Sequence, residues 1–278
     1  MIRTLPFALL LLSCGPTPPT PVVATKKGPT IIVRDDLANL YDSLQLQGSF
    51  IMHDAGKDSW TLIDSAQADV PTLPASTFKI FGSLIGVESG VLSGPDHVFT
   101  WDGIDRGRVE VNKNLTLREA YRVSAYWYFQ RLAQQLGPDQ LKHWLDTVGY
   151  GNADTTGGYD QCWVAGGLRI TPRQQVEFLE RVQRGDVPFS TRTLDLVKGI
   201  MVQGDTLGYV LRGKTGWAMN DEGSIGWYVG WVEKADGSGP YFFVNRIRTT
   251  DTLSTTFAAA RKDLAMEFMA RLGAIPKR

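Results

Sequence analysis

Cysteine and histidine are scarce in this sequence, and their scarcity excludes several kinds of site. The 278 residues include two cysteines, Cys14 and Cys162, and three histidines. Neither a disulfide framework nor a zinc-binding spacing can be built from this set. The histidines also stand in neither a G-x-S-x-G nor an H-E-x-x-H motif, which argues against histidine-assisted serine or zinc hydrolysis. We therefore expect no metal cofactor and expect Cys162 to be a buried, unreactive thiol.

An excess of charge and a long apolar run are also lacking. Lys+Arg and Asp+Glu both number 29, so the formal net charge is zero. A nucleic-acid partner normally requires a basic stripe, and a bilayer-spanning helix needs roughly 18–20 apolar residues. We expect neither. A hydrophobic content of 43% is that of a globular protein with enough material for a core.

The N-terminus has the composition of an export signal. Arg3 precedes an almost wholly apolar stretch over residues 5–12, and small residues follow before Cys14. This order resembles a bacterial lipobox, which predicts a signal peptide over residues 1–13, lipidation of Cys14 and a periplasmic, membrane-anchored lipoprotein. The alternative is a plain secretory signal. Residues 14–30 are rich in proline and threonine and read as a tether, so that the lipid anchor is the expected membrane contact.

Hydrophobic patterning over residues 31–278 predicts an α+β fold. A hairpin is expected over residues 48–64. Three further strands are expected over 207–212, 224–232 and 240–248, and no helix is expected between these three. Helices are expected over 76–88, 116–136, 138–147, 171–184, 194–201 and 254–272. This order predicts an antiparallel sheet built from both termini, with flanking helices and a helical insertion at about 90–204.

Two residues at the start of the first long helix could form a nucleophile and its base. Ser76 and Lys79 are three positions apart, so their side chains share one helix face. Serine needs a base to remove its proton, and a lysine kept neutral by apolar surroundings can act as that base. The helix is apolar nearly all round, which predicts that it is buried.

A second pattern is typical of nucleotide binding, but the residues around it do not predict the loop and helix that such a site needs. Residues 208–215 satisfy the phosphate-loop motif G-x-x-x-x-G-K-[ST]. That motif needs a flexible loop followed by a helix, whereas Tyr209, Val210 and Leu211 prefer a strand. We therefore do not expect an NTPase.

Several short motifs gain specificity from their order along the chain. Ser76-Thr-Phe-Lys79 comes early, and Lys214-Thr-Gly216 lies on a late strand; this set resembles the penicillin-recognising serine enzymes. Within that superfamily the chain resembles the class D, or OXA-type, β-lactamases over about residues 35–275. The further residues that carry the resemblance are Ser124-Ala-Tyr126, Tyr150-Gly-Asn152, Gln161-Cys-Trp163, 168–172 and Gly226–Trp231.

The resemblance implies a mechanism and a β-lactam substrate. Ser76 would be acylated, and Lys79 would be carboxylated by carbon dioxide to N6-carboxylysine, the general base. Trp163 would hydrogen-bond that carbamate; without the resemblance it would be an ordinary core aromatic. No cofactor other than carbon dioxide or bicarbonate is implied.

The remaining site residues also follow from the resemblance. Ser124 would relay a proton to the lactam nitrogen, with Lys214 beside it, although a serine in a helix is often only structural. Substrate-binding residues would be Thr215, Gly216, Arg261 and Tyr126, and the backbone N–H groups of Ser76 and Trp217 would form the oxyanion hole. Arg261 could equally be a surface residue.

One residue departs from the family pattern. Tyr126 stands where valine is usual, next to the expected carbamate, so carboxylation, deacylation and substrate range could all differ from the family. Three activities follow as expectations: hydrolysis of β-lactams, stable acylation as in a β-lactam sensor, or a small transpeptidase or carboxypeptidase. The sequence is compatible with a monomer or a homodimer.

Overall fold

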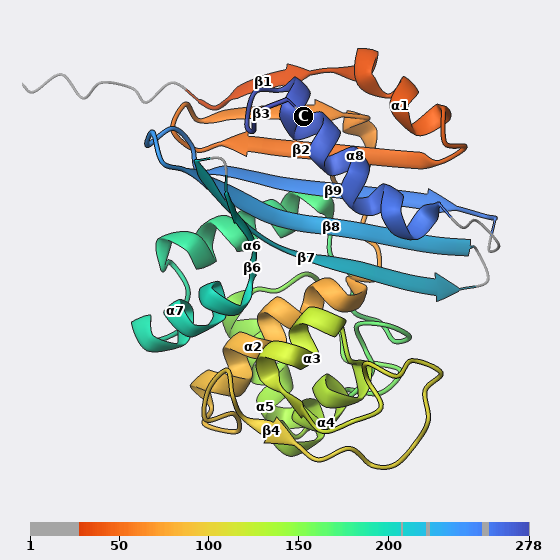
Figure 1. Ribbon diagram of the computed structural model, residues 1–278, viewed down its shortest axis with the longest axis vertical. Coiled ribbons are helices and arrows are strands. Elements are labelled where there is room, and N and C mark those ends of the chain that lie inside the picture. The colour runs from red at the N-terminus through yellow and green to blue at the C-terminus, as the bar shows by residue number, and fades with distance from the viewer. Residues whose placement is uncertain (1–27, 207, 221–222, 252–255, 278) are drawn as a thin grey trace, which may run out of the picture.

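A seven-stranded sheet forms one layer of the protein. The computed structural model describes residues 28–206, 208–220, 223–251 and 256–277, so Cys14, the expected signal peptide and most of the expected tether lie outside the described residues. Along the sheet the strand order is β1-β3-β2-β9-β8-β7-β6 (Figure 1). The bounds are Thr30–Val33 (β1), Gln47–Asp54 (β2), Ser59–Ile63 (β3), Val202–Thr206 (β6), Tyr209–Asn220 (β7), Gly223–Lys234 (β8) and Tyr241–Thr249 (β9).

Strands from the two ends of the chain meet in the middle of this sheet. β2 pairs antiparallel with β9 from Gln47 opposite Arg248 to Asp54 opposite Tyr241. The expectation of an antiparallel sheet built from both termini is therefore confirmed, with one exception. β1 pairs parallel with β3. The sequence patterning did not predict β1 or β6.

Alternating side chains bury both faces of the sheet. On β2, Phe50 and Met52 pack with helix α8 (Phe257–Arg271), whereas Ile51 packs in the larger core on the other face. The short helix α1 (Asn39–Asp42) lies on the same side of the sheet as α8 (Figure 1). β8 is buried along its first ten residues, as a strand covered on both faces should be.

The other face of the sheet carries the helical part of the chain, which extends away from it (Figure 1). Its elements are α2 (Phe78–Glu88), α3 (Leu117–Val123), α4 (Tyr126–Leu136), α5 (Pro138–Val148), α6 (Pro172–Arg184) and α7 (Thr191–Ile200), with a short pair of strands, β4 (Val98–Phe99) and β5 (Leu115–Thr116). Thr116 and Thr171 both form capping boxes, which explains why the starts of α3 and α6 could be predicted.

Helix α2 is the buried centre of the helical part. Every residue from Phe78 to Val87 is buried, which confirms the prediction from its apolar surface. The expected start at Ser76 needs a correction, because Ala75–Thr77 forms a 3-10 turn that leads into the helix. Ala75 has φ +50°, an uncommon value for a residue with a side chain.

Two other predicted boundaries were wrong. The helix predicted over 116–136 is two helices, since Ser124 adopts a left-handed conformation with φ 59° between α3 and α4. β7 runs unbroken to Asn220, whereas the predicted strand ended at residue 212. The phosphate-loop pattern therefore lies in a strand, which excludes the loop-then-helix geometry that phosphate binding needs. No helix in the described ranges is long and apolar enough to cross a membrane.

Candidate active site

Ser76 and Lys79 meet as the sequence predicted. Lys79 Nζ lies 3.0 Å from Ser76 Oγ, and Lys79 has no exposed surface. Burial is the main reason that the pKa of Lys79 falls from its usual 10.5 to about 7, and the positive charge of Arg108 contributes. A substantial fraction of Lys79 is thus neutral at physiological pH, in reach of the serine proton.

The turn that carries Ser76 is held from several sides. Ala75 N donates to Trp163 O over 2.8 Å, and Trp227 Nε1 donates to Leu73 O over 2.9 Å. Gly216 on β7 approaches the turn so closely that a Cβ there would lie 3.1 Å from Pro74 O. A side chain at Gly216 would therefore push the strand away from the nucleophile, which is the physical reason for glycine at this position.

Ser124 and Lys214 form a second pair beside the first. Lys214 Nζ donates to Ser124 Oγ over 2.8 Å and to Thr215 O over 3.0 Å. Burial first, and then the positive charge of Lys79, lowers the pKa of Lys214 well below its usual value. The break between α3 and α4 turns the Ser124 hydroxyl toward the sheet, so that the two serines face one cleft.

Trp163 packs against the residue that precedes the lysine. Its indole stacks on the Phe78 ring with centroids 4.4 Å apart and an interplanar angle of 2°. The indole is fully buried, and its Nε1 has no hydrogen-bond partner in the described part of the chain. An unsatisfied buried donor is costly, so this N–H is available for an acceptor brought by a modification or a ligand. The neighbouring Cys162 is a buried free thiol, as predicted.

A cleft of about 710 Å³ opens over the two serines. Its lining includes Thr215 and Trp217 of β7 and Arg261 of α8. Arg261 Nη1 donates to Gly216 O over 3.0 Å, and its guanidinium lies 5.3 Å from the centre of the Trp217 ring. These contacts hold the Arg261 guanidinium at the cleft. Arg261 is therefore not the plain surface residue that the sequence also allowed.

Tyr126 also lines the cleft and is half-buried. Its ring centroid lies 6.1 Å from that of Trp163. Burial, with the charge of Asp160 nearby, raises the pKa of the phenol to about 12, so the hydroxyl stays neutral. The aromatic ring thus occupies space between the open cleft and the buried indole.

The structure adds lining residues that the sequence did not single out: Arg108, Glu110, Arg122, Val123 and Val164. Arg108 and Glu110 lie in the loop before β5, where no helix or strand was predicted, whereas Arg122 and Val123 end α3. Arg108 and Glu110 carry no motif spacing that would mark them, and their place at the cleft depends on tertiary contacts.

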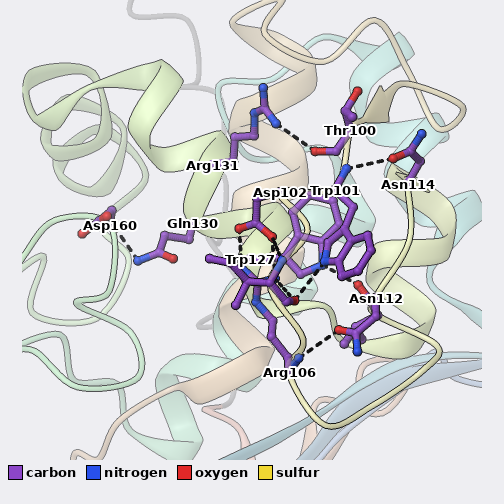
Figure 2. Close-up of polar contacts among 12 residues, drawn as sticks. Thr100, Trp101, Asp102, Arg106, Asn112, Asn114, Trp127, Gln130, Arg131 and Asp160 are labelled. Atoms are coloured by element: carbon purple, nitrogen blue, oxygen red, sulfur yellow. Dashed lines mark hydrogen bonds and ion pairs between the residues drawn. The ribbon is translucent and has the colours of Figure 1, made fainter.

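A polar network orders this loop (Figure 2). The Asp102 carboxylate accepts from Arg106 Nη1 and Nη2 at 2.8 and 2.6 Å, and Arg106 N donates to Asn112 Oδ1 over 3.0 Å. Trp127 Nε1 on α4 donates to Val111 O over 2.8 Å. The loop is therefore attached to the helix that follows Ser124 rather than left to move freely.

Every predicted catalytic side chain thus lies in or under one cleft. Ser76, Ser124, Thr215, Trp217, Tyr126 and Arg261 line it, Lys79 and Lys214 each reach a lining serine, and Trp163 packs beside Lys79 through Phe78. Gly216 contributes close backbone packing. No group of three or more His, Cys, Asp or Glu side chains that could hold a metal occurs among the described residues.

A serine on the turn before a buried helix, with a buried lysine one turn on and a Lys-Thr-Gly strand beside it, is the arrangement of the penicillin-recognising serine enzymes. The penicillin binding protein transpeptidase domain family matches residues 57–270. The beta-lactamase OXA-5 of Pseudomonas aeruginosa is 36% identical over 238 residues, which cover 84% of this chain and 87% of that protein. The protein belongs to the class D β-lactamase family.

Two solved structures are similar to this chain over most of its length. A class D beta-lactamase from Sebaldella termitidis has a TM-score of 0.85 and 32% identity, with coverage of 89% of this chain and all of that chain. The C-terminal domain of the Bacillus licheniformis BlaR penicillin receptor has a TM-score of 0.83 and 30% identity, with coverage of 91% and 100%. The same fold therefore occurs in an enzyme and in a receptor.

Proposed function

We propose that the protein hydrolyses β-lactam antibiotics through an acyl-enzyme on Ser76. The observation that carries this proposal is the fully buried Lys79, with Nζ 3.0 Å from the Ser76 hydroxyl oxygen and a pKa that burial lowers to about 7. A base of this kind can take the serine proton at neutral pH without a histidine.

Acylation begins with attack of Ser76 Oγ on the lactam carbonyl carbon. The backbone N–H groups of Ser76 and Trp217 stabilise the oxyanion, and collapse forms the ester while the lactam C–N bond breaks. The nitrogen that leaves takes a proton from the Ser124 hydroxyl, which Lys214 resupplies across their 2.8 Å hydrogen bond. Thr215 and Arg261 hold the substrate carboxylate at the same end of the cleft.

Lys79 is suited to carboxylation. A neutral amine adds to carbon dioxide and loses one proton to give a carbamate, and the pKa of about 7 provides the neutral amine. The unpaired Trp163 Nε1, beside Phe78, supplies a hydrogen-bond donor that fits an anionic oxygen. Such a carbamate would be the general base for the serine and then for the water that cleaves the ester.

A sensor that is acylated without turnover is the second candidate. It is favoured by the likeness to the BlaR penicillin-receptor domain and by the bulk of Tyr126, which lines the same cleft as Ser76. The two functions share acylation and differ in the lifetime of the ester.

One experiment separates the candidates. Purified protein is mixed with nitrocefin and with benzylpenicillin, with and without bicarbonate, and intact mass is followed over time. Hydrolysis predicts transient acylation, turnover and stimulation by bicarbonate. An adduct that persists for hours without turnover would assign the sensor function, and absence of any adduct would overturn both.

We also propose that the protein is an exported, membrane-anchored lipoprotein of the periplasm. Support comes from the charged start, the apolar stretch and the position of Cys14 in the sequence. Radiolabelled palmitate should be incorporated into the expressed protein and lost in Cys14→Ser. Unlabelled wild-type protein would contradict the anchor.

A further inference from the structure

One wall of the cleft carries three charged residues that the proposed mechanism does not place in contact with the substrate. Arg108, Glu110 and Arg122 line the same cavity as Ser76, but none of them makes a hydrogen bond to either catalytic serine or lysine. Arg108 and Glu110 come from the loop before α3, and Arg122 comes from the last turn of α3. In the proposed mechanism, Thr215 and Arg261 bind the ring carboxylate that penicillins and cephalosporins share.

Arg108 is paired with its neighbour Glu110. Its Nε donates to Glu110 Oε1 over 2.9 Å, and its Nη2 donates to Val123 O over 2.9 Å. The second contact ties the loop to the residue before Ser124. Arg108 therefore holds the wall in place, and the Arg108–Glu110 pair contributes little net charge to it.

Arg122 supplies the uncompensated charge. Its side chain is exposed at the cleft, and no hydrogen bond or ion pair reaches it from the part of the chain that the structure describes. A guanidinium offers up to five donors in a planar fork that fits a carboxylate or sulfonate. Its position on a helix fixes the backbone from which it reaches into the cavity.

The loop beside Arg122 is ordered before any ligand arrives. Figure 2 shows the contacts of Asp102 with Arg106, and of Trp127 with the loop backbone, that fix this segment. A wall that needs no ordering on binding loses less conformational entropy when a ligand docks.

We propose that Arg122, supported by Arg108, forms a subsite for a second anionic group on the β-lactam, in addition to the carboxylate held by Thr215 and Arg261. The inference rests on the proposed function and names its substrate class: β-lactams with a carboxylate, sulfonate or acidic heterocycle as a second anion. The attraction acts across a partly hydrated cleft, so salt screens it, most strongly at charge separations beyond a Debye length of about 8–10 Å.

The test uses pairs of substrates that differ in one charge. Benzylpenicillin and carbenicillin differ by a carboxylate on the acyl side chain, and ampicillin carries an ammonium there instead. Cefotaxime and ceftriaxone share the acyl side chain, and only ceftriaxone carries an acidic ring substituent. Values of kcat/KM, or acylation rate constants by mass if turnover is slow, are measured at 20 and 300 mM salt.

In at least one pair, we expect the wild-type protein to favour the compound with the second anionic group over the compound that lacks it, by about threefold to tenfold at low salt. Arg122→Gln should abolish that preference, and Glu110→Gln should increase it. Arg118→Gln is the matched control, because Arg118 lies one turn earlier on α3 and outside the cleft lining. The responding pair tells whether the anion sits on the acyl side chain or on the ring.

Equal rates within both pairs, or a preference that survives Arg122→Gln, would overturn the subsite while leaving the proposed function intact. Failure of every compound to acylate Ser76 would instead overturn the proposed function. The two results are therefore distinguishable in one set of measurements.

Discussion

Lys214 and Ser124, ninety residues apart in the chain, share a hydrogen bond of 2.8 Å between their side chains. The lysine belongs to β7 of the sheet, and the serine sits at the break between α3 and α4 of the helical part. Ser76 lies in the 3-10 turn that precedes α2, so the site is formed where the sheet packs against the helices. Its geometry therefore depends on how these two parts pack together.

The first prediction concerns Lys79 as the base. Lys79→Met should fold, become acylated slowly and lose steady-state turnover of nitrocefin by about 10²–10⁴-fold, the usual contribution of a general base. Methionine has a similar volume but no amine to accept a proton. Stopped-flow absorbance and intact mass measure the two steps, and circular dichroism checks the fold. Turnover within threefold of wild type would remove Lys79 from the mechanism.

The second prediction is a pH dependence of stability. The pKa of Lys79 is about 7 in the folded protein and near 10.5 in the unfolded chain, so between these values the unfolded state binds more protons. Stability should then rise with pH by up to about 1.4 kcal/mol per unit from pH 7 toward 10, relative to Lys79→Met. Urea denaturation in buffer free of carbon dioxide measures this difference, which should be flat below pH 6. A constant difference across the whole range would show that Lys79 is not buried as a neutral amine.

The sequence predicted the site better than it predicted the elements that build it. Ser76, Lys79 and Lys214 are marked by short motifs whose spacing reflects chemistry, and capping boxes at Thr116 and Thr171 mark two helix starts. The break at Ser124 could not be read from local patterning, because the residues around it suit one continuous helix. The left-handed Ser124 directs its hydroxyl to Lys214 on β7, a partner ninety residues away that local patterning does not show.

The predictions of strands and of cleft-lining residues failed for a related reason. The predicted strand ended at residue 212, yet pairing with β8 continues β7 to Asn220. β1 is exposed along its length and lacks the alternation of a half-buried strand. The roles of Arg108 and Arg122 depend on which residues surround one cavity, which no spacing along the chain encodes.

The third prediction tests the indole of Trp163. Trp163→Phe keeps an aromatic ring on Phe78 but removes the buried donor, so a carbamate on Lys79 should be less stable. We expect turnover to fall at least about tenfold and to recover partly at high bicarbonate. Carbon-13 NMR with labelled bicarbonate should show a carbamate resonance in the wild type that weakens in the variant.

A matched control for this variant is Trp144→Phe. Trp144 on α5 stacks on Phe189 at 5.2 Å and does not line the cleft. Trp144→Phe should change neither the carbamate resonance nor the dependence of turnover on bicarbonate. A full carbamate signal in Trp163→Phe would assign the indole to packing alone.

The fourth prediction identifies Arg246 as a positioning residue. Arg246 is 2% exposed, and its guanidinium donates to Val70 O over 2.7 Å and to Gln67 Oε1 over 2.6 Å, which holds the segment leading to Ser76. Arg246→Met should destabilise the protein by about 2–4 kcal/mol, because buried acceptors lose their donors. It should also lower kcat more than it changes KM.

Two further variants make this result specific. Arg246→Lys keeps the charge but not the planar fork, so it should restore little of the loss. Arg271→Ala removes an exposed arginine paired with Glu267 and should cost no more than about 0.5 kcal/mol. If Arg246→Lys behaved as wild type, charge rather than geometry would be the function of Arg246.

The fifth prediction concerns Tyr126, the residue that departs from the family pattern. Its half-buried ring lines the cleft and lies 6.1 Å from Trp163, so Tyr126→Val should open space between the cleft and the lysine. Water should then reach the ester more easily, and we expect deacylation to accelerate by about threefold to thirtyfold. Tyr126→Phe keeps the ring and removes the neutral hydroxyl, so it separates bulk from hydrogen bonding. Single-turnover decay of the acyl-enzyme, followed by mass, measures both variants. If Tyr126→Phe accelerated decay as much as Tyr126→Val, the hydroxyl would be the controlling group; if Tyr126→Val slowed decay, the ring would be assisting the approach of water rather than obstructing it.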